Sequence, residues 1–329
     1  MKHATRLSDL GLEILNRILS TAKDWKGKPH PKHLRDKLLG MLFFNPSLRT
    51  RASFEAVMAR GGGSAIVMEA GSSTWKLEHR TGVVMDLDRA EHLKEAVPVL
   101  CRYVDALAVR TFAGGVDDNA DHDDAVIKAF REYATVPVVS METAREHPCQ
   151  GIADLLTIED QFGSAKGLPV TLTWVPHIKV LPKAVPNSFL LTAAARGCEL
   201  RVAHPQGFEL HPDVVHEAEI YADASGGTVS FFHEQYPALK GSRAVYAKAW
   251  GPATLSELGS DVVKQYPYWM ISSQHMERAP GDAIFLHCLP VRINVEIADA
   301  VLDGPWSRVV DEAENRFHVQ RALLDWLLN

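Results

Sequence analysis

The sequence is poor in cysteine, has no excess of positive charge and contains no long apolar run. Its four cysteines, among 329 residues, include no Cys-x-x-Cys pair, so they predict neither a disulfide framework nor a zinc cluster. No apolar run reaches the roughly 20 residues of a membrane span, and the N-terminus lacks the apolar core of a signal peptide. A net charge of -6 disfavours general binding to nucleic acid. We therefore expect a cytoplasmic protein with reduced thiols that binds neither membranes nor nucleic acid.

The rest of the composition is that of an ordinary globular protein. Hydrophobic residues make up 46% of the chain and charged residues 23%, which gives little support to a disordered or fibrous chain. At 329 residues the chain is too long for one simple core, and the usual size of a domain suggests roughly two domains.

Short apolar runs recur along the chain, with room for a helix between most of them. They are residues 39–44, 65–68, 106–109 and 136–139, followed by 170–174, 200–203, 228–232, 244–247 and 284–286. Such runs are typical of parallel strands joined by crossover helices. We therefore predict an α/β fold with two parallel-sheet domains, residues 1–148 and 149–316. A helix over 151–162 would connect them, and a last helix over 317–329 would pack back on the first domain.

The segment from Ser47 to Arg51 directly follows the first predicted strand. Ser47 can cap a helix, and the free N–H groups and dipole of a helix start favour an anion. Arg49 and Arg51 add two guanidinium forks, which suit a phosphate group. The segment therefore predicts a phosphate site, although a solvated arginine pair is the alternative.

Other polar residues also follow the ends of predicted strands. Ligands of open parallel sheets bind at the carboxyl ends of the strands, and we expect a cleft between two such edges. The residues in question are Ser47, Arg110, His204, Lys248 and His287.

His147 and Gln150 lie three residues apart at the start of the connecting helix. Both could direct a donor at one carbonyl oxygen that gains negative charge. The alternative for His147 is a polar residue that caps the helix.

Cys288 lies between His287 and Arg292, where a thiolate nucleophile is conceivable. We prefer a second interpretation, in which the main-chain carbonyl of Cys288 accepts hydrogen bonds from an amide group. The reason is that phosphate leaving an activated carbonyl requires no covalent intermediate.

Two further patterns favour structure over ligand binding. The acidic run 117–124 lacks the glycine and terminal glutamate of a calcium loop and suits a solvated helix start. The glycines 61–63 follow a helix and therefore end it. We predict no metal site.

Taken together, Ser47-x-Arg49-Thr50-Arg51, His147-Pro148-x-Gln150 and His287-Cys288-Leu289-Pro290 resemble the signature of the aspartate and ornithine transcarbamoylase family. Glu312-Ala313-x-Asn315-Arg316 is similar to a further family element. The closest similarity is to the N-acylornithine branch, the N-acetylornithine and N-succinylornithine carbamoyltransferases. Ordinary ornithine enzymes are expected to have an acidic residue at the position of Lys248. A lysine at this position fits an acceptor whose α-amine has lost its positive charge.

The resemblance implies a role for each matching residue. The carbamoyl phosphate site would comprise Ser47, Leu48, Arg49, Thr50, Arg51, Trp75, Arg110, His147, Gln150, Cys288, Leu289 and Arg316. Of these, His147, Gln150, Arg316 and Thr50 would stabilise the oxyanion, the carbonyls of Cys288 and Leu289 would bind the carbamoyl amine, and Trp75 would come from a neighbouring subunit of a homotrimer. The acylornithine site would comprise Ala90, Glu142, Asn187, Lys248, Leu289 and Arg292.

The acyl group is predicted from one position. Acetyl-specific relatives are expected to have a glutamate where Ala90 stands, and succinyl-specific relatives a proline. Alanine leaves space and removes a charge that would repel a succinyl carboxylate, which favours N-succinylornithine. A shift of one residue in the alignment would instead place Glu91 at this position.

Two positions depart from the acetyl pattern. Glu296 replaces a lysine that is carboxylated in the acetyl enzymes and keeps its negative charge. The loop 252–263 is shorter than theirs, and Lys264 is a candidate for the lysine that closes over the substrate.

The predicted reaction is transfer of a carbamoyl group from carbamoyl phosphate to the δ-amine of an N-acylated ornithine, a step of arginine biosynthesis, without a cofactor. One rival is a carbamoyltransferase for ornithine, putrescine or a ureido compound. A rival of another class is a non-catalytic anion-binding paralogue.

Overall fold

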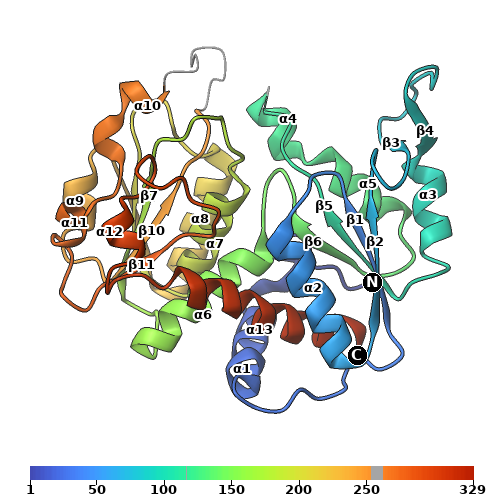
Figure 1. Cartoon of the computed structure of the whole chain (residues 1–329), viewed down its shortest axis with the longest axis horizontal. Coiled ribbons are helices and arrows are strands. Elements are labelled where there is room, and N and C mark those ends of the chain that lie inside the picture. The colour runs from blue at the N-terminus through green and yellow to red at the C-terminus, as the bar shows by residue number, and fades with distance from the viewer. Residues whose placement is uncertain (116, 253–261) are drawn as a thin grey trace. The chain divides into compact units, whose positions relative to one another are not determined.

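The protein is described by a computed structural model, which covers residues 1–115, 117–252 and 262–329. The chain divides into two compact units (Figure 1). The first comprises Met1–Ala113, Asp123–Cys149 and Arg316–Asn329, and the second comprises Gly114–His122 and Gln150–Asn315. Residues Gly114–His122 thus group with the second unit, although they lie within the predicted residues 1–148.

The first unit is built on a parallel sheet in the order β2-β1-β5-β6. Each strand matches a predicted apolar run to within a few residues. Strands β1, β5 and β6 are almost wholly buried, and such a strand has a continuous apolar sequence, whereas the edge strand β2 is only partly buried. The strands are β1 (Leu38–Phe43), β2 (Ser64–Glu69), β5 (Ala106–Arg110) and β6 (Val138–Glu142).

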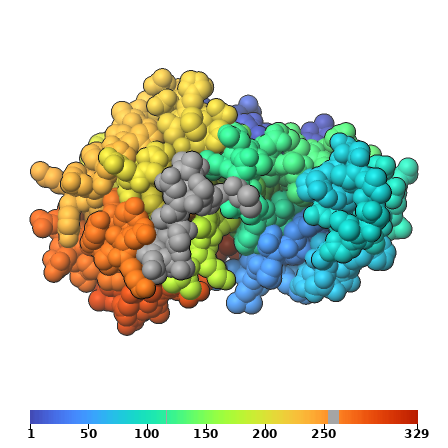
Figure 2. Space-filling model, turned by 90° about the horizontal axis from the view of Figure 1, so that it is seen from above, coloured from blue at the N-terminus to red at the C-terminus, as the bar shows by residue number. Residues whose placement is uncertain are grey.

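Helices surround this sheet and share its core. Leu42, Val97, Leu107 and Phe130 are buried together and belong to two strands and two helices. The helices are α1 (Leu7–Trp25), α2 (Leu48–Gly61), α3 (Leu93–Leu100) and α5 (Ala125–Tyr133). A short ribbon of β3 (Lys76–Glu78) and β4 (Arg89–His92), which the sequence did not predict, projects from this unit and is drawn in cyan in Figures 1 and 2.

The second unit is built on a parallel sheet in the order β11-β10-β7-β8-β9. Its strands are β7 (Pro169–Trp174), β8 (Glu199–Ala203), β9 (Thr228–Phe232), β10 (Ala244–Lys248) and β11 (Ile284–Leu286). Its longer helices are α7 (Ala184–Ala195) and α8 (Pro212–Ser225), and its shorter ones are α9 (Gln235–Leu239), α10 (Val262–Gln265), α11 (Ser273–Met276) and α12 (Asp299–Leu302). Residues Gly114–His122 add most of α4 (Asp118–Asp123).

Two long helices carry residues of both units. Helix α6 (Pro148–Phe162) matches the predicted connecting helix, and α13 (Val309–Leu328) begins eight residues before the predicted Phe317. The earlier start places the Glu312-to-Arg316 motif on a helix. No helix within the described residues is both long and apolar enough to cross a membrane.

Candidate active site

In the first unit, the strand order reverses between β1 and β5, and the predicted phosphate residues follow these two strands. Chain order runs from β1 outward to β2 on one side and from β5 to β6 on the other. Such a reversal opens a crevice at the carboxyl ends of the strands. Ser47 lies just beyond β1, and Arg110 is the last residue of β5.

Helix α2 begins where the sequence predicts. The Ser47 hydroxyl accepts a hydrogen bond from the Thr50 main-chain N–H at 3.3 Å, which is the expected N-cap. The other end is capped by Gly62 in the left-handed conformation, as the glycine run predicts. The Leu48 side chain is 82% exposed, and its main-chain N–H is one of the first N–H groups of the helix, which favour an anion.

The two arginines of the motif differ in their surroundings. Arg51 pairs with Glu55 at 3.4 Å and with Glu69 at 3.0 Å on the surface. The buried Nε of Arg49 hydrogen-bonds to no residue in the described part of the chain. Arg49 is therefore the guanidinium of this helix start that is best placed to bind an external anion.

Two further arginines converge on Thr50. Arg316, on α13, donates to the Thr50 hydroxyl at 2.7 Å, and Arg110 lies 3.5 Å from the same oxygen. Arg110 is also held by Glu142, with 2.6 Å between Nη1 and Oε2. Three segments distant in sequence thus place two buried cations at one hydroxyl.

Glu142 was predicted as a contact of the acylornithine. In the structure its carboxylate is paired with Arg110, so it orients a residue predicted to bind carbamoyl phosphate.

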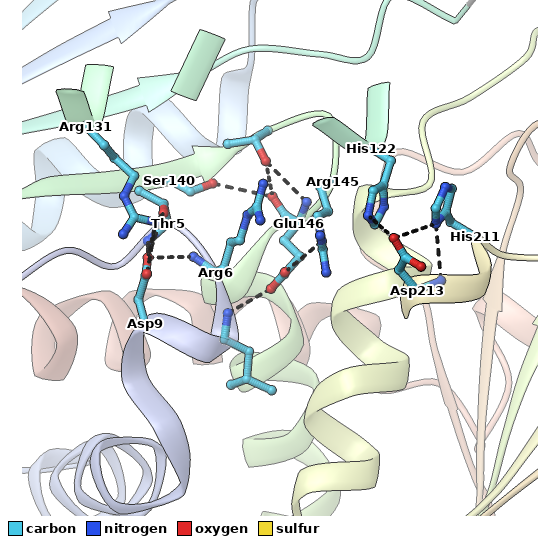
Figure 3. A network of polar contacts seen from close by, with 12 residues as sticks. Thr5, Arg6, Asp9, His122, Arg131, Ser140, Arg145, Glu146, His211 and Asp213 are labelled. Atoms are coloured by element: carbon cyan, nitrogen blue, oxygen red, sulfur yellow. Dashed lines mark hydrogen bonds and ion pairs between the residues drawn. The ribbon is translucent and has the colours of Figure 1, made fainter. Parts of the chain in front are cut away.

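His147 lies at the end of a loop that hydrogen bonds keep rigid. The Thr143 N–H donates to the Glu146 carbonyl at 2.9 Å, and the Ser140 hydroxyl lies 3.4 Å from the same oxygen. The Glu146 carboxylate accepts the Leu7 N–H at 2.8 Å, and Asp9 pairs with Arg131 at 3.0 Å nearby (Figure 3). The N-terminal segment therefore fixes the loop that carries His147.

His147 is buried and neutral at physiological pH. Burial, followed by the nearby charges of Arg316 and Arg110, lowers the pKa of His147 well below 6.5. A neutral imidazole can donate an N–H to a carbonyl oxygen without carrying a charge that the arginines would repel.

This lowered pKa predicts that acid destabilises the fold. Between the folded pKa and the unfolded pKa near 6.5, His147 binds a proton only in the unfolded chain, so the free energy of unfolding falls as pH drops and recovers as pH rises. The slope from one such histidine is about 1.4 kcal/mol per pH unit. Urea unfolding at pH 7.5, 6.5 and 5.5 should show a steeper decline for wild type than for His147→Gln. Equal slopes would contradict the prediction.

In the second unit, the strand order reverses between β7 and β10, and Lys248 is the last residue of β10. Lys248 is 8% exposed, and no carboxylate in the described ranges forms a salt bridge with it. The Nε of Arg292 donates to His177 Nε2 at 3.1 Å. Burial and the charges of Lys248 and Arg292 lower the pKa of His177, against the opposing effects of Lys179 and Glu296. This end of the sheet is therefore cationic.

A small pocket adjoins these residues. It is lined by His177 and Lys179 and by the aromatic side chains of Trp174, Phe208 and Trp250. Its lining therefore combines aromatic rings with one lysine and one histidine.

Glu296 contacts Arg292 and lies near His287. Its carboxylate accepts the Arg292 N–H at 2.7 Å and lies 4.0 Å from the Nε2 of His287. It thereby orients Arg292 through the main chain. Asn187 is buried in the first turn of α7.

The hydrogen bonds of Gln150 differ from the expected ones, in which its side chain donates to a carbonyl oxygen. Its amide nitrogen already donates to Asp154 at 2.7 Å and to Glu312 at 2.9 Å. Both N–H groups are thus used, and the group of this side chain left without a hydrogen bond in the described residues is its buried oxygen, which can only accept.

The segment His287–Leu289 is shaped by the same glutamate. Glu312 accepts the His287 N–H at 2.8 Å, and the ring of His287 accepts the Leu289 N–H at 2.9 Å. The Cys288 side chain is partly exposed.

Trp75 and Ala90 lie in or beside the β3–β4 ribbon of the first unit. Trp75 is 59% exposed, and its indole N–H donates to Glu91 at 2.7 Å. Ala90 is exposed and directly precedes Glu91 at an irregularity in the β3–β4 pairing, where Arg89 and Glu91 pair with Lys76 and Leu77. Of these two neighbours, Glu91 is the one that accepts the indole hydrogen bond.

Several residues of this region were missed from the sequence. Asp154 and His177 have no distinctive spacing, although each is a buried or partly buried polar residue. Glu312 belongs to a quoted motif, but its contacts with Gln150 and His287 were not predicted. The acidic run 117–124 contains the whole of the short helix α4, none of whose residues is buried, in keeping with the predicted solvated segment. The four cysteines form no disulfide. The predicted loop 252–263 falls largely outside the described residues, and Lys264 lies in the short helix α10.

Comparisons with known proteins assign the family. Residues 2–160 match the model of the aspartate/ornithine carbamoyltransferase carbamoyl-P binding domain, and residues 181–327 match the Asp/Orn binding domain. The chain is 37% identical to the N-acetylornithine carbamoyltransferase of Xanthomonas campestris, over 98% of this chain and 97% of that protein. It is 39% identical to the N-succinylornithine carbamoyltransferase of Bacteroides thetaiotaomicron, over 86% and 84% of the two chains.

A solved structure is similar over the whole fold. It is a glutamate-to-alanine variant of N-acetyl-L-ornithine transcarbamylase complexed with carbamyl phosphate and N-succinyl-L-norvaline. It superposes with a TM-score of 0.96 at 37% identity and covers 99% of this chain and 100% of that chain. With both domain models matched in order, the chain belongs to the aspartate/ornithine carbamoyltransferase family and is a carbamoyltransferase.

Proposed function

We propose that this enzyme transfers the carbamoyl group of carbamoyl phosphate to the δ-amine of an N-acyl-L-ornithine, with the N-succinyl compound as the preferred acceptor. The products are an N-acylcitrulline and phosphate. The observation that carries the proposal is the buried, carboxylate-free Lys248 at the end of β10.

Lys248 distinguishes an acylated acceptor from free ornithine. Free ornithine presents an α-ammonium group, which a buried lysine would repel. Acylation converts that group into a neutral amide and leaves the α-carboxylate, for which Lys248 and Arg292 supply cations. Relatives of both acyl types at 37% and 39% identity support this assignment.

Carbamoyl phosphate would bind at the start of α2. The helix N–H groups, Arg49 and Arg51 would hold the phosphate, and Arg110, Arg316 and Thr50 would meet the carbamoyl end. Neutral His147 would donate to the carbamoyl oxygen as it gains charge. The departing phosphate would accept the amine proton, so no separate general base is required.

Gln150 takes a different role from the one expected of it. Because Asp154 and Glu312 occupy its N–H groups, its oxygen would accept a hydrogen bond from the carbamoyl NH₂. The carbonyls of Cys288 and Leu289 would accept from the same group. Three acceptors would thus orient the carbamoyl plane while His147 and Arg316 stabilise the oxyanion.

The acyl preference depends on the β3–β4 ribbon. Ala90 stands where the resemblance places the glutamate of acetyl-specific enzymes, and it adds neither bulk nor charge. The similar solved structure carries alanine in place of a glutamate and holds N-succinyl-L-norvaline. This supports the proposal that an alanine at the position of Ala90 leaves room for a succinyl group. For Trp75 to reach the substrate it would act from a neighbouring subunit, and we propose a homotrimer.

The acceptor experiment compares N-succinylornithine, N-acetylornithine and free ornithine at equal concentration with saturating carbamoyl phosphate. We expect citrulline-type product at a rate that falls in that order. Predominant use of free ornithine would refute the Lys248 argument, and no product with any of them would favour the non-catalytic alternative.

Ala90→Glu is expected to reverse the acyl preference. The new carboxylate would repel a succinyl carboxylate, which lowers kcat/KM for N-succinylornithine by about tenfold or more, while N-acetylornithine is affected less. Ala90→Gln is the control, since it adds the same bulk without charge. Equal losses in the two variants would show that size, not charge, governs the pocket.

A further inference from the structure

His204 was singled out in the sequence because it follows a strand, yet the carbamoyl transfer site does not use it. It directly follows β8, and His233 directly follows β9. The last residues of these strands, Ala203 and Phe232, are paired in the parallel ladder, and the His204 N–H donates to the Phe232 carbonyl at 3.0 Å. The register therefore places the two histidines side by side.

Glu209 completes a group of three. It lies in the loop after β8, where a turn from Pro205 to Phe208 and the left-handed Gly207 bring it back toward the strand ends. One possible ligand atom from each of His204, Glu209 and His233 lies within 4.8 Å of the other two. His204 is buried, whereas Glu209 and His233 are exposed and can adjust.

The hydrogen bonds of both imidazoles favour a tautomer that leaves one ring nitrogen free to bind a metal ion. His204 Nδ1 lies 2.9 Å from the Pro205 carbonyl, and His233 Nδ1 lies 3.2 Å from the His204 carbonyl. A carbonyl oxygen can only accept, so each Nδ1 carries the hydrogen and each Nε2 keeps its lone pair. Histidine ligands of metals are oriented in this way by a second hydrogen bond.

A lysine next to this group of three is already bound within the protein. The neighbouring Lys183 ammonium is bound by Asp118 at 2.9 Å and by the Glu209 carbonyl at 3.2 Å, which partly offsets its charge.

A second histidine cluster shows the contrast. His122 and His211 are stacked 3.7 Å apart beside Asp213 (Figure 3). There His211 Nδ1 accepts the Asp213 N–H, and its Nε2 donates to Asn119 at 3.1 Å. Both ring nitrogens of His211 are thus used within the protein, and this cluster holds α4 against the start of α8.

We propose that His204 Nε2, His233 Nε2 and the Glu209 carboxylate form a binding site for one divalent transition-metal ion of the zinc class. Two imidazoles and one carboxylate are a known ligand set for Zn²⁺ and leave a fourth position for water. The site lies at the ends of β8 and β9, and its ligands are not among the residues proposed to bind the acceptor. It would join the end of β9 to the loop of Phe208, which lines the small pocket beside His177.

The test is titration of the metal-stripped full chain with ZnCl₂ at pH 7.5 by isothermal calorimetry, with thermal unfolding in parallel. We expect wild type to bind one Zn²⁺ per chain at this site and to melt at a higher temperature with zinc. His233→Ala and Glu209→Gln should each lose that equivalent or bind it more than about tenfold more weakly. Both residues are exposed, so the variants should fold as wild type does.

His216→Ala is the matched control, because His216 is an exposed histidine on α8 outside the cluster. It should bind zinc as wild type does. Unchanged stoichiometry and affinity in either His233→Ala or Glu209→Gln would overturn the three-ligand site, as would absence of zinc binding by wild type. Because the readout is metal binding, the result does not depend on which acceptor the enzyme uses.

Discussion

Arg49→Ala is expected to lower kcat/KM for carbamoyl phosphate by about 10²–10³-fold without loss of the fold. The Nε of Arg49 hydrogen-bonds to no residue in the described ranges, so removing this side chain breaks little within the protein. Its position in the first turn of α2 puts the guanidinium beside helix N–H groups that favour phosphate. Initial rates with varied carbamoyl phosphate at saturating acceptor measure the effect, and thermal unfolding checks the fold.

Two variants sharpen this experiment. Arg60→Ala removes an exposed arginine from the last turn of the same helix and should leave kcat/KM unchanged. Arg49→Lys keeps the charge but not the planar fork, and it should recover only part of the activity. Near-normal turnover and unchanged affinity of Arg49→Ala for carbamoyl phosphate would remove this arginine from the phosphate site.

Lys248→Met is expected to raise KM for the acylornithine by about 30-fold or more, while the affinity for carbamoyl phosphate stays the same. Methionine keeps much of the length of the side chain but removes the charge that would meet the α-carboxylate. The loss is large because the lysine is only 8% exposed, where water screens the interaction little. Steady-state kinetics give KM, and calorimetry with carbamoyl phosphate alone gives the second affinity.

Lys240→Met serves as the control for Lys248→Met. Lys240 is exposed at the end of α9 in the same unit, and its loss should change neither substrate. If Lys248→Met raised the apparent affinity for free ornithine alone and left acylornithine untouched, the lysine would act as a barrier to the wrong acceptor and not as a ligand of the right one.

Local features of the fold were predictable because they depend on residues close in sequence. The Ser47 cap joins residues three apart, and Gly62 ends the same helix because glycine adopts the left-handed conformation at little cost. The strands at 170–174 and 228–232 were recognised from their apolar runs. The β3–β4 ribbon was missed because its short strands, with sequences KLE and RAEH, contain few apolar residues.

The sequence by itself determined which residues cap helices, which runs become buried strands and which polar residues stand at strand ends. Only the tertiary structure decided their partners: Arg316 with Thr50 across 266 residues, Gln150 with Glu312, and His204 beside His233. The reason is physical. Caps and buried faces follow from short-range hydrogen bonding and periodicity, whereas partners from distant segments depend on strand order and register. The neutral state of His147 likewise depends on burial, which no local pattern specifies.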